Sequence, residues 1–507
     1  MNPRFRFYPQ LLVCTLLICC GHSENTKAAE HHFQVSFLKS IHPEPFTGRV
    51  YLIFTKSNRE PRFGPSWFQP ESFIAQDVTN WQPGELLELG PETKGLLSYP
   101  KPLAEMDLAG YHAQAVARFN STDPKIGTAP GNGFSPARQL SGGLVANIPS
   151  FTIDQLVPKK TFTETQWIKY FKLRSPLLSK FHEQETGFEA SVILPQSYYQ
   201  QPQRKYPVIY SIPGFGGDHQ RNLPQAPIAE QNSGGVEFIR VLLNPQCRWG
   251  HHVFADSATN GPVGKAFITE FLPELEKAFR AIPHSRARFL TGHSSGGWSS
   301  LWLQVTYPTV FGGTWSTAPD PVDFRDFQQI NIYEPGSNVY RDAGNQLRPI
   351  ARRGNQPILW FEPFAKMEQV LGPGGQLRSF EAVFSPRGAD GEPLKLYDWE
   401  TGAINKEVAE AWKAYDIRLV LESNWKQLAP ELAGKIHVFM GDQDTFYLNG
   451  ATQLLKQTLE QLDADAVVEI HQGKNHSNLL TRELMLRIRA EMVQAFLNYQ
   501  AEIQPAD

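Results

Sequence analysis

Cysteine is nearly absent from the 507-residue sequence outside its first twenty positions. Cys14, Cys19 and Cys20 lie in that short segment, and only Cys247 lies beyond it. A chain that retains one cysteine cannot form an intramolecular disulfide, so the fold must depend on its hydrophobic core, for which this length is sufficient. A lone cysteine is also more often a buried structural residue than a nucleophile.

The sequence also lacks an excess of charge of either sign. It has 48 lysines and arginines against 51 aspartates and glutamates, a net charge of -3. This balance gives no electrostatic reason for binding nucleic acid or an anionic membrane surface, and we expect neither partner. The metal-binding spacings HExxH and paired Cys/His are missing as well, so His251, His252 and Asp256 are only a weak alternative. We expect no metal and no cofactor.

No hydrophobic run is long enough to span a bilayer. The apolar run from Leu11 to Cys20 follows Arg4 and Arg6 and has the length of the apolar region of a signal peptide. We expect residues 1–29 to be a cleaved signal peptide and the protein to be exported to the periplasm, the medium or the cell surface. The residues just before Cys20 are not the small ones of a lipoprotein box, so a lipid anchor is the less favoured alternative.

After this segment, residues 30–165 are predicted to form a small all-β sandwich domain. Runs that alternate apolar and polar residues include Phe33 to Leu38, Gly48 to Thr55 and Ala113 to Phe119, and this pattern is typical of half-buried strands. Clusters of proline and glycine separate the runs. Residues 121–150 are rich in turn-forming residues and are predicted to be a long loop or linker.

Residues 166–507 alternate strands with helices, which favours a mainly parallel, doubly wound α/β sheet. Tyr206 to Ile212 and Lys435 to Met440 are examples of the apolar runs that predict strands. One stretch, about residues 320–434, is far longer than the helix and two loops that a compact α/β unit needs. We expect this insertion to emerge near the functional site, and most of its many aromatic residues to form a core of their own.

The five residues Gly292-His293-Ser294-Ser295-Gly296 match G-x-S-x-G, the turn that presents a nucleophilic serine. Five residues can match by chance, so the flanking sequence matters. Ala287 to Thr291 predicts a strand before the motif, and apolar residues at i, i+3, i+4 and i+7 from Trp298 predict a helix after it. Strand, turn and helix are the context that the motif requires. Ser294 is therefore the predicted nucleophile.

A serine nucleophile needs a base within hydrogen-bond reach and a third group that orients the base. Where G-x-S-x-G serves this chemistry, the acid and then the histidine follow late strands. His476 follows the predicted strand that ends at Ile470 and is favoured as the base over His471, which lies nearer the strand end. Asp444 is favoured as the acid over Asp442, which can instead bond nearby backbone amides in its turn.

The negative oxygen that develops during acyl transfer needs two N–H donors. Ser295, which follows the nucleophile, is the expected first donor. The second is expected from the loop Pro213 to Gly217, which follows the predicted strand ending at Ile212, with Phe215 as the donor. Glycines let this backbone approach a substrate closely. The loop lacks the Gly-Lys-Ser/Thr ending of a phosphate-binding loop.

Together these motifs resemble the putative esterase family of α/β-hydrolases, which includes esterase D, feruloyl esterases, enterochelin esterases and mycolyltransferases. The resemblance covers residues 185–320 and 435–500, including Leu194-Pro195 and Tyr206-Pro207-Val208. It is specific for the fold and the catalytic triad and unspecific for the substrate. The chain departs from many relatives at Pro213, where they carry histidine. The amino-terminal β domain resembles the β-sandwich that precedes the hydrolase in enterochelin esterases.

The sequence therefore predicts an exported serine esterase that hydrolyses carboxylic esters through an acyl-enzyme. The expected substrate is a small-molecule or carbohydrate-linked ester, such as an acylated carbohydrate or a siderophore-like ester. Two alternatives stay open: an acyltransferase or peptidase with the same triad, and a carbohydrate-binding protein with a vestigial hydrolase site. No sequence pattern indicates the oligomeric state.

Overall fold

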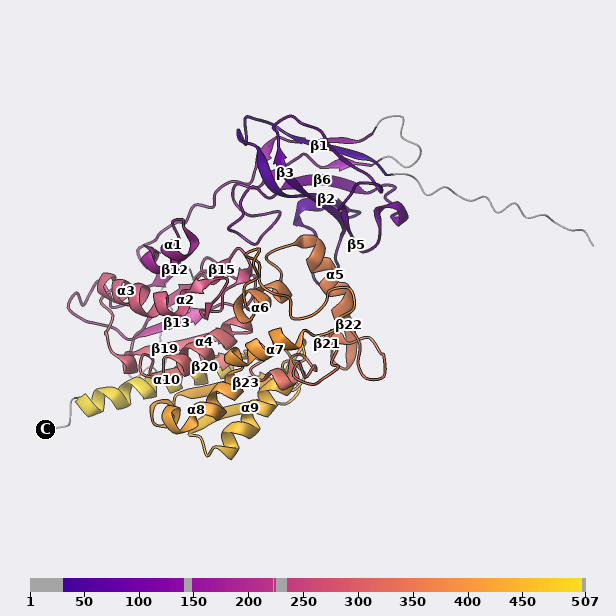
Figure 1. Ribbon diagram of the computed structural model, residues 1–507. Helices are drawn as coiled ribbons and strands as arrows, with labels where there is room; N and C mark the ends of the chain where they lie inside the picture. Colours follow the sequence, from indigo (N-terminus) through magenta and orange to yellow (C-terminus); the bar gives the residue numbers. More distant parts are fainter. Residues whose placement is uncertain (1–30, 141–147, 222, 225–234, 504–507) are drawn as a thin grey trace, which may run out of the picture.

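The computed structural model of the protein describes residues 31–140, 148–221, 223–224 and 235–503. The predicted signal peptide, residues 1–29, lies outside them. Within the described part, no helix combines the length and the hydropathy that crossing a membrane requires. Figure 1 shows an amino-terminal β unit in indigo, an α/β unit with pink and yellow elements, and the orange helices α5 and α6 beside the boundary of the two.

The amino-terminal unit contains two β-sheets. Its strands are β1 (Phe33–Phe37), β2 (Phe46–Thr55), β3 (Ser72–Trp81), β4 (Leu87–Leu89), β5 (Leu97–Tyr99), β6 (His112–Ala117), β7 (Gly133–Phe134), β8 (Arg138–Gln139), β9 (Ser150–Ile153) and β10 (Gln155–Leu156). One sheet has the order β4-β1-β9, and the other β10-β7-β6-β2-β3-β5, with β8 also paired to β6. Alternate side chains of β1 and β2, such as Val35 and Leu52, point into one buried cluster that both sheets share.

The predicted linker over residues 121–150 is wrong in part. The described residues of this stretch include β7 and β8, which both pair with β6. Its turn-forming residues build a compact loop: Asn132 is fully buried, its side-chain oxygen accepts a hydrogen bond from the Asn120 amide, and its nitrogen donates to the Ile126 carbonyl. Part of the polar composition therefore reflects internal hydrogen bonding.

The second unit is built on an eight-stranded sheet. In spatial order its strands are β11 (Ile168–Arg174), β12 (Gly187–Ile193), β14 (Ile239–Leu243), β13 (Val208–Ile212), β19 (Arg288–His293), β20 (Gly313–Thr317), β23 (Ile436–Gly441) and β24 (Ala466–His471). The strands from β14 to β24 are parallel, whereas β11 and β12 are antiparallel at one edge. The sheet is mainly parallel, as predicted. The edge strand β11 was not predicted.

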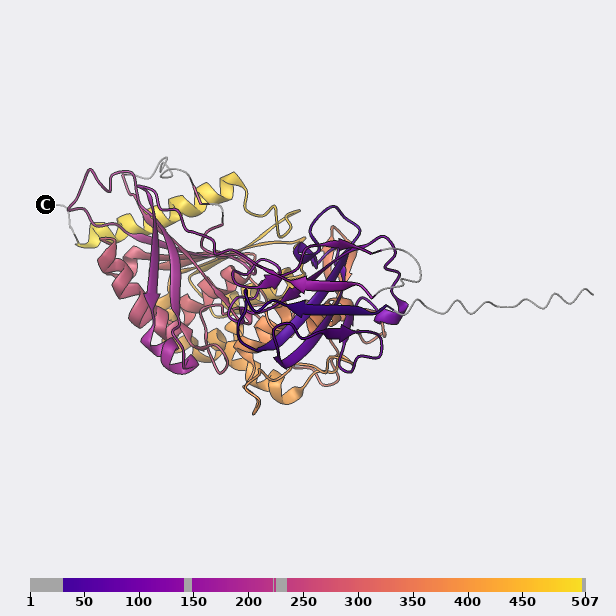
Figure 2. The same ribbon diagram turned by 90° about the horizontal axis from the view of Figure 1, so that it is seen from above.

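Helices cover both faces of this sheet. They are α1 (Pro176–His182), α2 (Val263–Ala266), α3 (Leu272–Ala278), α4 (Ser295–Thr306), α8 (Ile417–Leu432), α9 (Asn449–Gln461) and α10 (Arg482–Ile503). Helix α10 packs on the face that carries Ile209 and Phe289, and α3 and α4 pack on the face that carries Tyr210 and Leu290. Figure 2 shows the yellow α10 on one side of the strands and the pink helices on the other.

The long segment between β20 and β23 forms a subdomain beside the sheet. It contains β21 (Pro349–Arg353), β22 (Gln356–Trp360), α5 (Phe361–Leu371), α6 (Gln376–Phe384) and α7 (Lys406–Trp412), and it ends in α8. Trp399 and Trp412 are buried in a hydrophobic cluster that also contains Tyr51 and Phe73 of the amino-terminal unit and Trp298 of α4. Aromatic residues of the insertion therefore form a core, and this core joins the two units.

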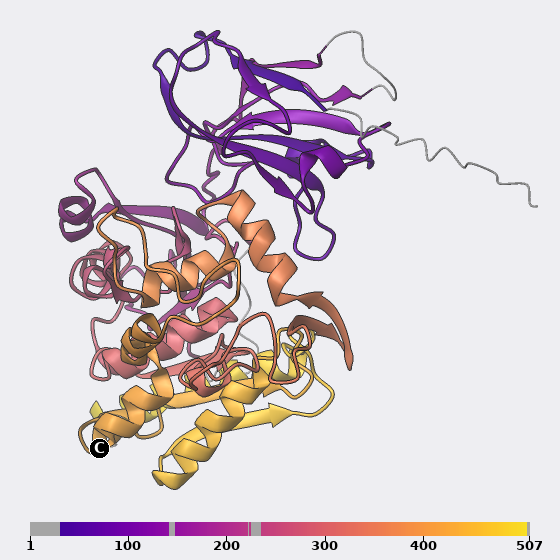
Figure 3. The same cartoon turned by 45° about the vertical axis from the view of Figure 1, so that its right-hand side comes forward.

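Hydrogen bonds fasten α5 to the amino-terminal sheet. Arg49 of β2 donates to the carbonyl oxygens of Gln369 (2.9 Å) and Val370 (3.0 Å), and the Tyr51 hydroxyl donates to that of Leu371 (2.6 Å). These carbonyls lie at the end of α5, where the helix leaves them without internal partners. Figure 3 shows α5 directly beneath the amino-terminal unit.

Candidate active site

Ser294 lies at the turn between β19 and α4, where the G-x-S-x-G motif predicts it. Its φ of 60° and ψ of -126° are a strained combination for a residue other than glycine. A Cβ at Gly292 would lie 2.0 Å from the carbonyl oxygen of Gly296, and one at Gly296 would lie 2.0 Å from that of Ile212. The close packing of strand and helix around the serine therefore requires both glycines.

His476 and Asp444 form a buried pair. The two residues follow β24 and β23, and His476 Nδ1 lies 2.7 Å from Asp444 Oδ2. The other carboxylate oxygen accepts hydrogen bonds from the amides of Phe446 (2.9 Å) and Leu448 (3.3 Å). Burial disfavours the charged imidazole, but the hydrogen bond and charge of Asp444, with the charge of Asp320, raise the pKa of His476. The bond at Nδ1 leaves Nε2 as the ring nitrogen that can act as a base.

The two weaker sequence candidates have other contacts. Asp442 Oδ1 accepts a hydrogen bond from the Gly473 amide at 2.6 Å, and His471 Nε2 lies 3.4 Å from the Glu469 carboxylate. Arg352 of the insertion donates to the carbonyl oxygens of Asp444 (2.8 Å) and Asp442 (3.1 Å). The insertion thus helps to fix the loop that carries Asp444.

Ser294 and His476 share one cavity of about 340 Å³. Its wall is mostly apolar and contains several aromatic rings; its polar residues include Arg221 and Gln328 in addition to the groups at the serine. The walls come from the amino-terminal unit, the α/β unit and the insertion, and include Trp67, Phe215, Ile350, Leu359, Phe364, Phe380, Phe446 and Leu448. A cavity of this size with few polar groups is typical of a small-molecule site.

Trp67, from the loop between β2 and β3, is the contribution of the amino-terminal unit to this wall. Its ring stacks on Phe215, with centroids 5.6 Å apart, and meets the edges of Phe364 and Phe446 at 5.3 and 5.9 Å. Each of these three rings comes from a different segment of the remaining chain. Sequence reasoning missed Trp67, because no motif marks a residue that reaches a site from a separate unit.

Asp320 is a second residue that sequence reasoning missed. It follows β20, and its carboxylate accepts hydrogen bonds from the hydroxyls of Ser294 (3.4 Å) and Ser295 (2.5 Å) and from the Gln376 amide (3.3 Å). Burial raises the pKa of Asp320 to about 6, although the serine hydrogen bonds and His476 oppose this shift. The Ser294 hydroxyl is directed to Asp320, and no hydrogen bond joins Ser294 to His476, both of which are described residues.

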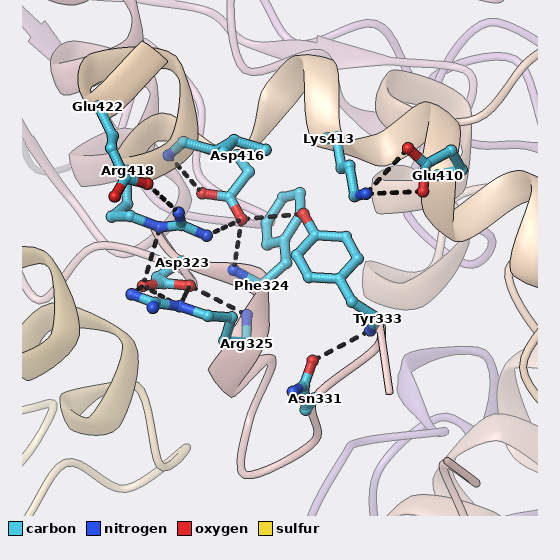
Figure 4. Close-up of polar contacts among 11 residues, drawn as sticks. Asp323, Phe324, Arg325, Asn331, Tyr333, Glu410, Lys413, Asp416, Arg418 and Glu422 are labelled. Carbon is cyan, nitrogen blue, oxygen red and sulfur yellow. Dashed lines mark hydrogen bonds and ion pairs between the residues drawn. The ribbon is translucent and has the colours of Figure 1, made fainter. Parts of the chain in front are cut away.

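A buried ionic network fixes the turn that follows Asp320 (Figure 4). The carboxylates of Asp323 and Asp416 are fully buried, and Arg418 lies between them, 3.2 Å from the first and 3.5 Å from the second. Asp416 also accepts a hydrogen bond from the Tyr333 hydroxyl (2.9 Å) and caps the start of α8. Buried carboxylates require such pairing. The network therefore ties the first turns of the insertion to α8.

The loop Pro213 to Gly217 approaches the serine from β13. A Cβ on Gly214 would lie 3.1 Å from the Ser294 Cβ, so glycine allows this close approach. Phe215 lines the cavity. Ser295 is the first residue of α4, and the amide of a first helical residue has no partner within its helix. Both predicted oxyanion donors thus belong to backbone segments next to Ser294.

His251 and His252 form hydrogen bonds with backbone groups. His251 Nε2 donates to the Pro213 carbonyl at 3.0 Å, and His252 Nδ1 accepts from the Phe254 amide at 3.1 Å. Burial lowers the pKa of His251 to about 4, so its ring is neutral near pH 7. No group of three or more His, Cys, Asp or Glu within the described ranges could hold a metal ion. Burial raises the pKa of the Cys247 thiol to about 12, which makes it a poor nucleophile.

Comparison with known families decides the classification. Residues 182–479, more than half of the chain, match the family described as Putative esterase. The chain belongs to this family. It is an esterase of the α/β-hydrolase type, a serine hydrolase of carboxylic esters.

Solved structures similar to this esterase include a ferulic acid esterase with 14% sequence identity and a TM-score of 0.39. The match covers 65% of this chain and 98% of the ferulic acid esterase. An S-formylglutathione hydrolase from Agrobacterium tumefaciens has 14% identity, 66% and 94% coverage, and a TM-score of 0.37. The fluorophosphonate-binding serine hydrolase F of Staphylococcus aureus has 13% identity, 64% and 98% coverage, and a TM-score of 0.39. No curated protein matches the chain.

Proposed function

We propose that this protein is an exported serine esterase with Ser294 as nucleophile, His476 as base and Asp444 as the acid that orients the base. The observation that carries the proposal is the buried His476–Asp444 pair beside a serine held at positive φ, in one cavity. Export rests on the predicted signal peptide over residues 1–29.

The proposed reaction begins with a rotation of the Ser294 hydroxyl from Asp320 toward His476 Nε2. The imidazole then accepts the serine proton as Oγ attacks the ester carbonyl, and the Phe215 and Ser295 amides stabilise the negative oxygen. His476 then gives the proton to the alcohol oxygen as the ester bond breaks. The alcohol departs, and the acyl group stays bound to Ser294 as an acyl-enzyme. Water, activated by the same imidazole, then releases the acid and restores the serine.

The apolar residues that line the cavity support a proposal for the acyl group of the substrate. Rings of Trp67, Phe364 and Phe446 surround a space too large for an acetyl group alone, and burial of an apolar chain or ring there contributes about 0.8 kcal/mol per CH₂. We propose an apolar acyl group, esterified to a small molecule or carbohydrate. We also propose that the two amino-terminal sheets form a β-sandwich domain, which supplies one wall of the cavity through Trp67.

The decisive experiment combines kinetics with active-site labelling. Ser294→Ala should lower kcat on p-nitrophenyl esters by roughly 10⁶-fold, because the nucleophile is lost, and should abolish labelling by a fluorophosphonate probe. Ser66→Ala, which removes an exposed serine of the Trp67 loop, is the matched control and should keep both properties. Wild-type labelling or turnover in Ser294→Ala would overturn the assignment.

Product analysis separates hydrolysis from its alternatives. With an added alcohol or sugar acceptor, a hydrolase releases mainly free acid, whereas an acyltransferase forms the new ester. Amide substrates test for peptidase activity. An absence of probe labelling in the wild-type protein would favour a binding protein with a vestigial site.

A further inference from the structure

A second cavity, of about 630 Å³, lies between the amino-terminal unit and the insertion. Its walls come from β2 and the residues before it, from Asp77 of β3, from the residues that follow β6, and from the insertion. Arg248, which lies between β15 (Gln246–Cys247) and β16 (Gly250–His251), completes them. Helix α6 separates the two cavities, because Gln376 and Phe380 line the first and Arg378 lines the second.

Positive charge predominates in this wall. The basic residues are Arg49, Arg118, Arg248, Arg378 and Lys395, and the acidic residues are Asp77, Glu368 and Glu392. This local excess contrasts with the net charge of -3 of the whole chain. Concentration of one sign of charge in a hollow favours ligands of the opposite sign.

The acidic residues of the wall are already engaged. Both carboxylate oxygens of Asp77 accept hydrogen bonds from Arg49 at 2.7 Å, and Glu392 lies 3.4 Å from Arg378. Glu368 is fully buried, and its carboxylate accepts hydrogen bonds from the first amides of α6. Burial raises the pKa of Glu368 to about 7. Glu392 also lies 3.8 Å from Arg248, so Arg118 and Lys395 are the basic residues of the wall without a described carboxylate within ion-pair distance.

Arg118 is the exceptional residue of the wall, because it is 93% buried and no described carboxylate lies within ion-pair distance. Its guanidinium donates to the carbonyl oxygens of Pro373 (2.5 Å), Asp123 (3.0 Å) and Arg248 (3.5 Å), while Nε has no partner. A buried cation is costly unless an anion lies nearby. The structure thus holds a buried positive charge at the wall of a cavity, and only the more distant charge of Asp123 offsets it.

We propose that this cavity binds an anionic saccharide through a carboxylate or phosphate group. Arg248 and Lys395 are exposed. Arg248 exchanges its contact with Glu392, at 3.8 Å, for the anion, Lys395 turns toward it, and Arg118 stabilises it from behind. Phe46 and Phe119 make part of the same wall apolar, and Thr47, Ser121 and Gln369 add polar groups for sugar hydroxyls. The site is separate from the ester chemistry and does not require Ser294.

Calorimetric titration of the full chain tests this site with glucuronic acid, glucose 6-phosphate, glucose and inorganic phosphate as ligands. We expect the two charged sugars to bind, to bind more weakly at high salt, and to bind at least tenfold more tightly than glucose, since one charged hydrogen bond contributes about 1.5 kcal/mol or more. Comparison of the two charged sugars distinguishes a carboxylate site from a phosphate site. Equal affinity for glucose, or for phosphate alone, would overturn the assignment.

Variants locate the site. Arg248→Gln and Lys395→Gln change exposed side chains and should each weaken binding about five- to tenfold without loss of folding, whereas Arg174→Gln, an exposed arginine at the end of β11, should have no effect. Ser294→Ala should bind like the wild type even though it lacks esterase activity. Unchanged binding in the double variant of Arg248 and Lys395 would place the ligand elsewhere and refute the proposal.

Discussion

Two carboxylates lie near the proposed nucleophile and make different contacts. Asp444 contacts His476 Nδ1 at 2.7 Å, which is the contact expected of the proposed triad acid, while Asp320 contacts the Ser294 hydroxyl directly at 3.4 Å. The first arrangement supports general-base catalysis. The second keeps the serine hydroxyl turned away from the base until it rotates. Their roles can be separated by neutral, nearly isosteric substitutions.

Asp444→Asn should lower kcat on the order of 10⁴-fold, because the amide no longer fixes the imidazole tautomer or stabilises its positive charge. Asp442→Asn is the matched control, since it removes a carboxylate two residues away that only bonds the Gly473 amide. It should leave kcat nearly unchanged. Steady-state kinetics on one p-nitrophenyl ester measures kcat of both variants. A larger loss of kcat in Asp442→Asn than in Asp444→Asn would show that Asp442 is the acid.

Asp320→Asn should stabilise the protein above pH 6. The raised pKa, about 6 instead of 3.8, means that the native state holds a proton that the unfolded state releases between about pH 4 and 6. Stability therefore falls as pH rises through this window, by on the order of 3 kcal/mol. Asparagine removes the ionisable group, so this fall should be absent. Denaturant unfolding at pH 4.5 and 8 measures the difference, and a variant no more stable than the wild type at pH 8 would contradict it.

At the scale of elements, the candidate active-site cavity is assembled from loops and helices of the two units and the insertion. The α/β sheet supplies Ser294, His476 and the loop with Phe215 at the carboxyl ends of parallel strands, the usual place for a ligand in such folds. Helices α5 and α6 add Phe364 and Phe380, and the loop before β3 adds Trp67. Acyl selectivity should therefore depend on elements outside the sheet.

Trp67→Ala should raise KM for a hexanoyl or benzoyl ester about tenfold, because removal of the indole opens the wall against which an apolar acyl group packs. Turnover of an acetyl ester should hardly change, since the serine and its partners are untouched. Leu86→Ala, an exposed apolar residue of the same unit, is the control. An equal loss on both esters would indicate a general structural defect instead of lost acyl selectivity.

For the whole molecule, the decisive feature is the hydrophobic cluster that crosses the boundary between the units. It joins Tyr51 and Phe73 of the amino-terminal sheet to α5, α6 and α4. Large apolar contacts of this kind couple units that would otherwise move or unfold separately. The insertion therefore connects the amino-terminal unit to the α/β sheet and also supplies part of the active-site wall.

A single calorimetric unfolding transition is the expected consequence of this coupling. Tyr51→Phe removes the buried hydrogen bond to the Leu371 carbonyl and should lower the midpoint of the whole transition, at a cost of about 1–2 kcal/mol. Phe63→Leu, at an exposed position of the same unit, serves as the control. Two separate transitions in the wild type would show that the units unfold independently.

Sequence alone determined the features that depend on local physics. The strand, turn and helix around Ser294 were readable because the packing at that turn admits only glycine at positions 292 and 296. The strands β19, β23 and β24, which precede Ser294, Asp444 and His476, were predicted from short runs rich in apolar residues, and the structure contains all three. The mainly parallel sheet followed from the alternation of such runs with amphipathic segments.

Only the tertiary structure decided the features that depend on contacts between distant segments. Asp320 meets Ser294, Trp67 meets Phe215, and Arg118 lies between the amino-terminal unit and the insertion, and none of these residues carries a local signature. Loop residues and aromatic residues show no sequence periodicity from which their distant contacts could be predicted. Their positions follow from how a long insertion packs between two units, which is a property of the folded chain as a whole.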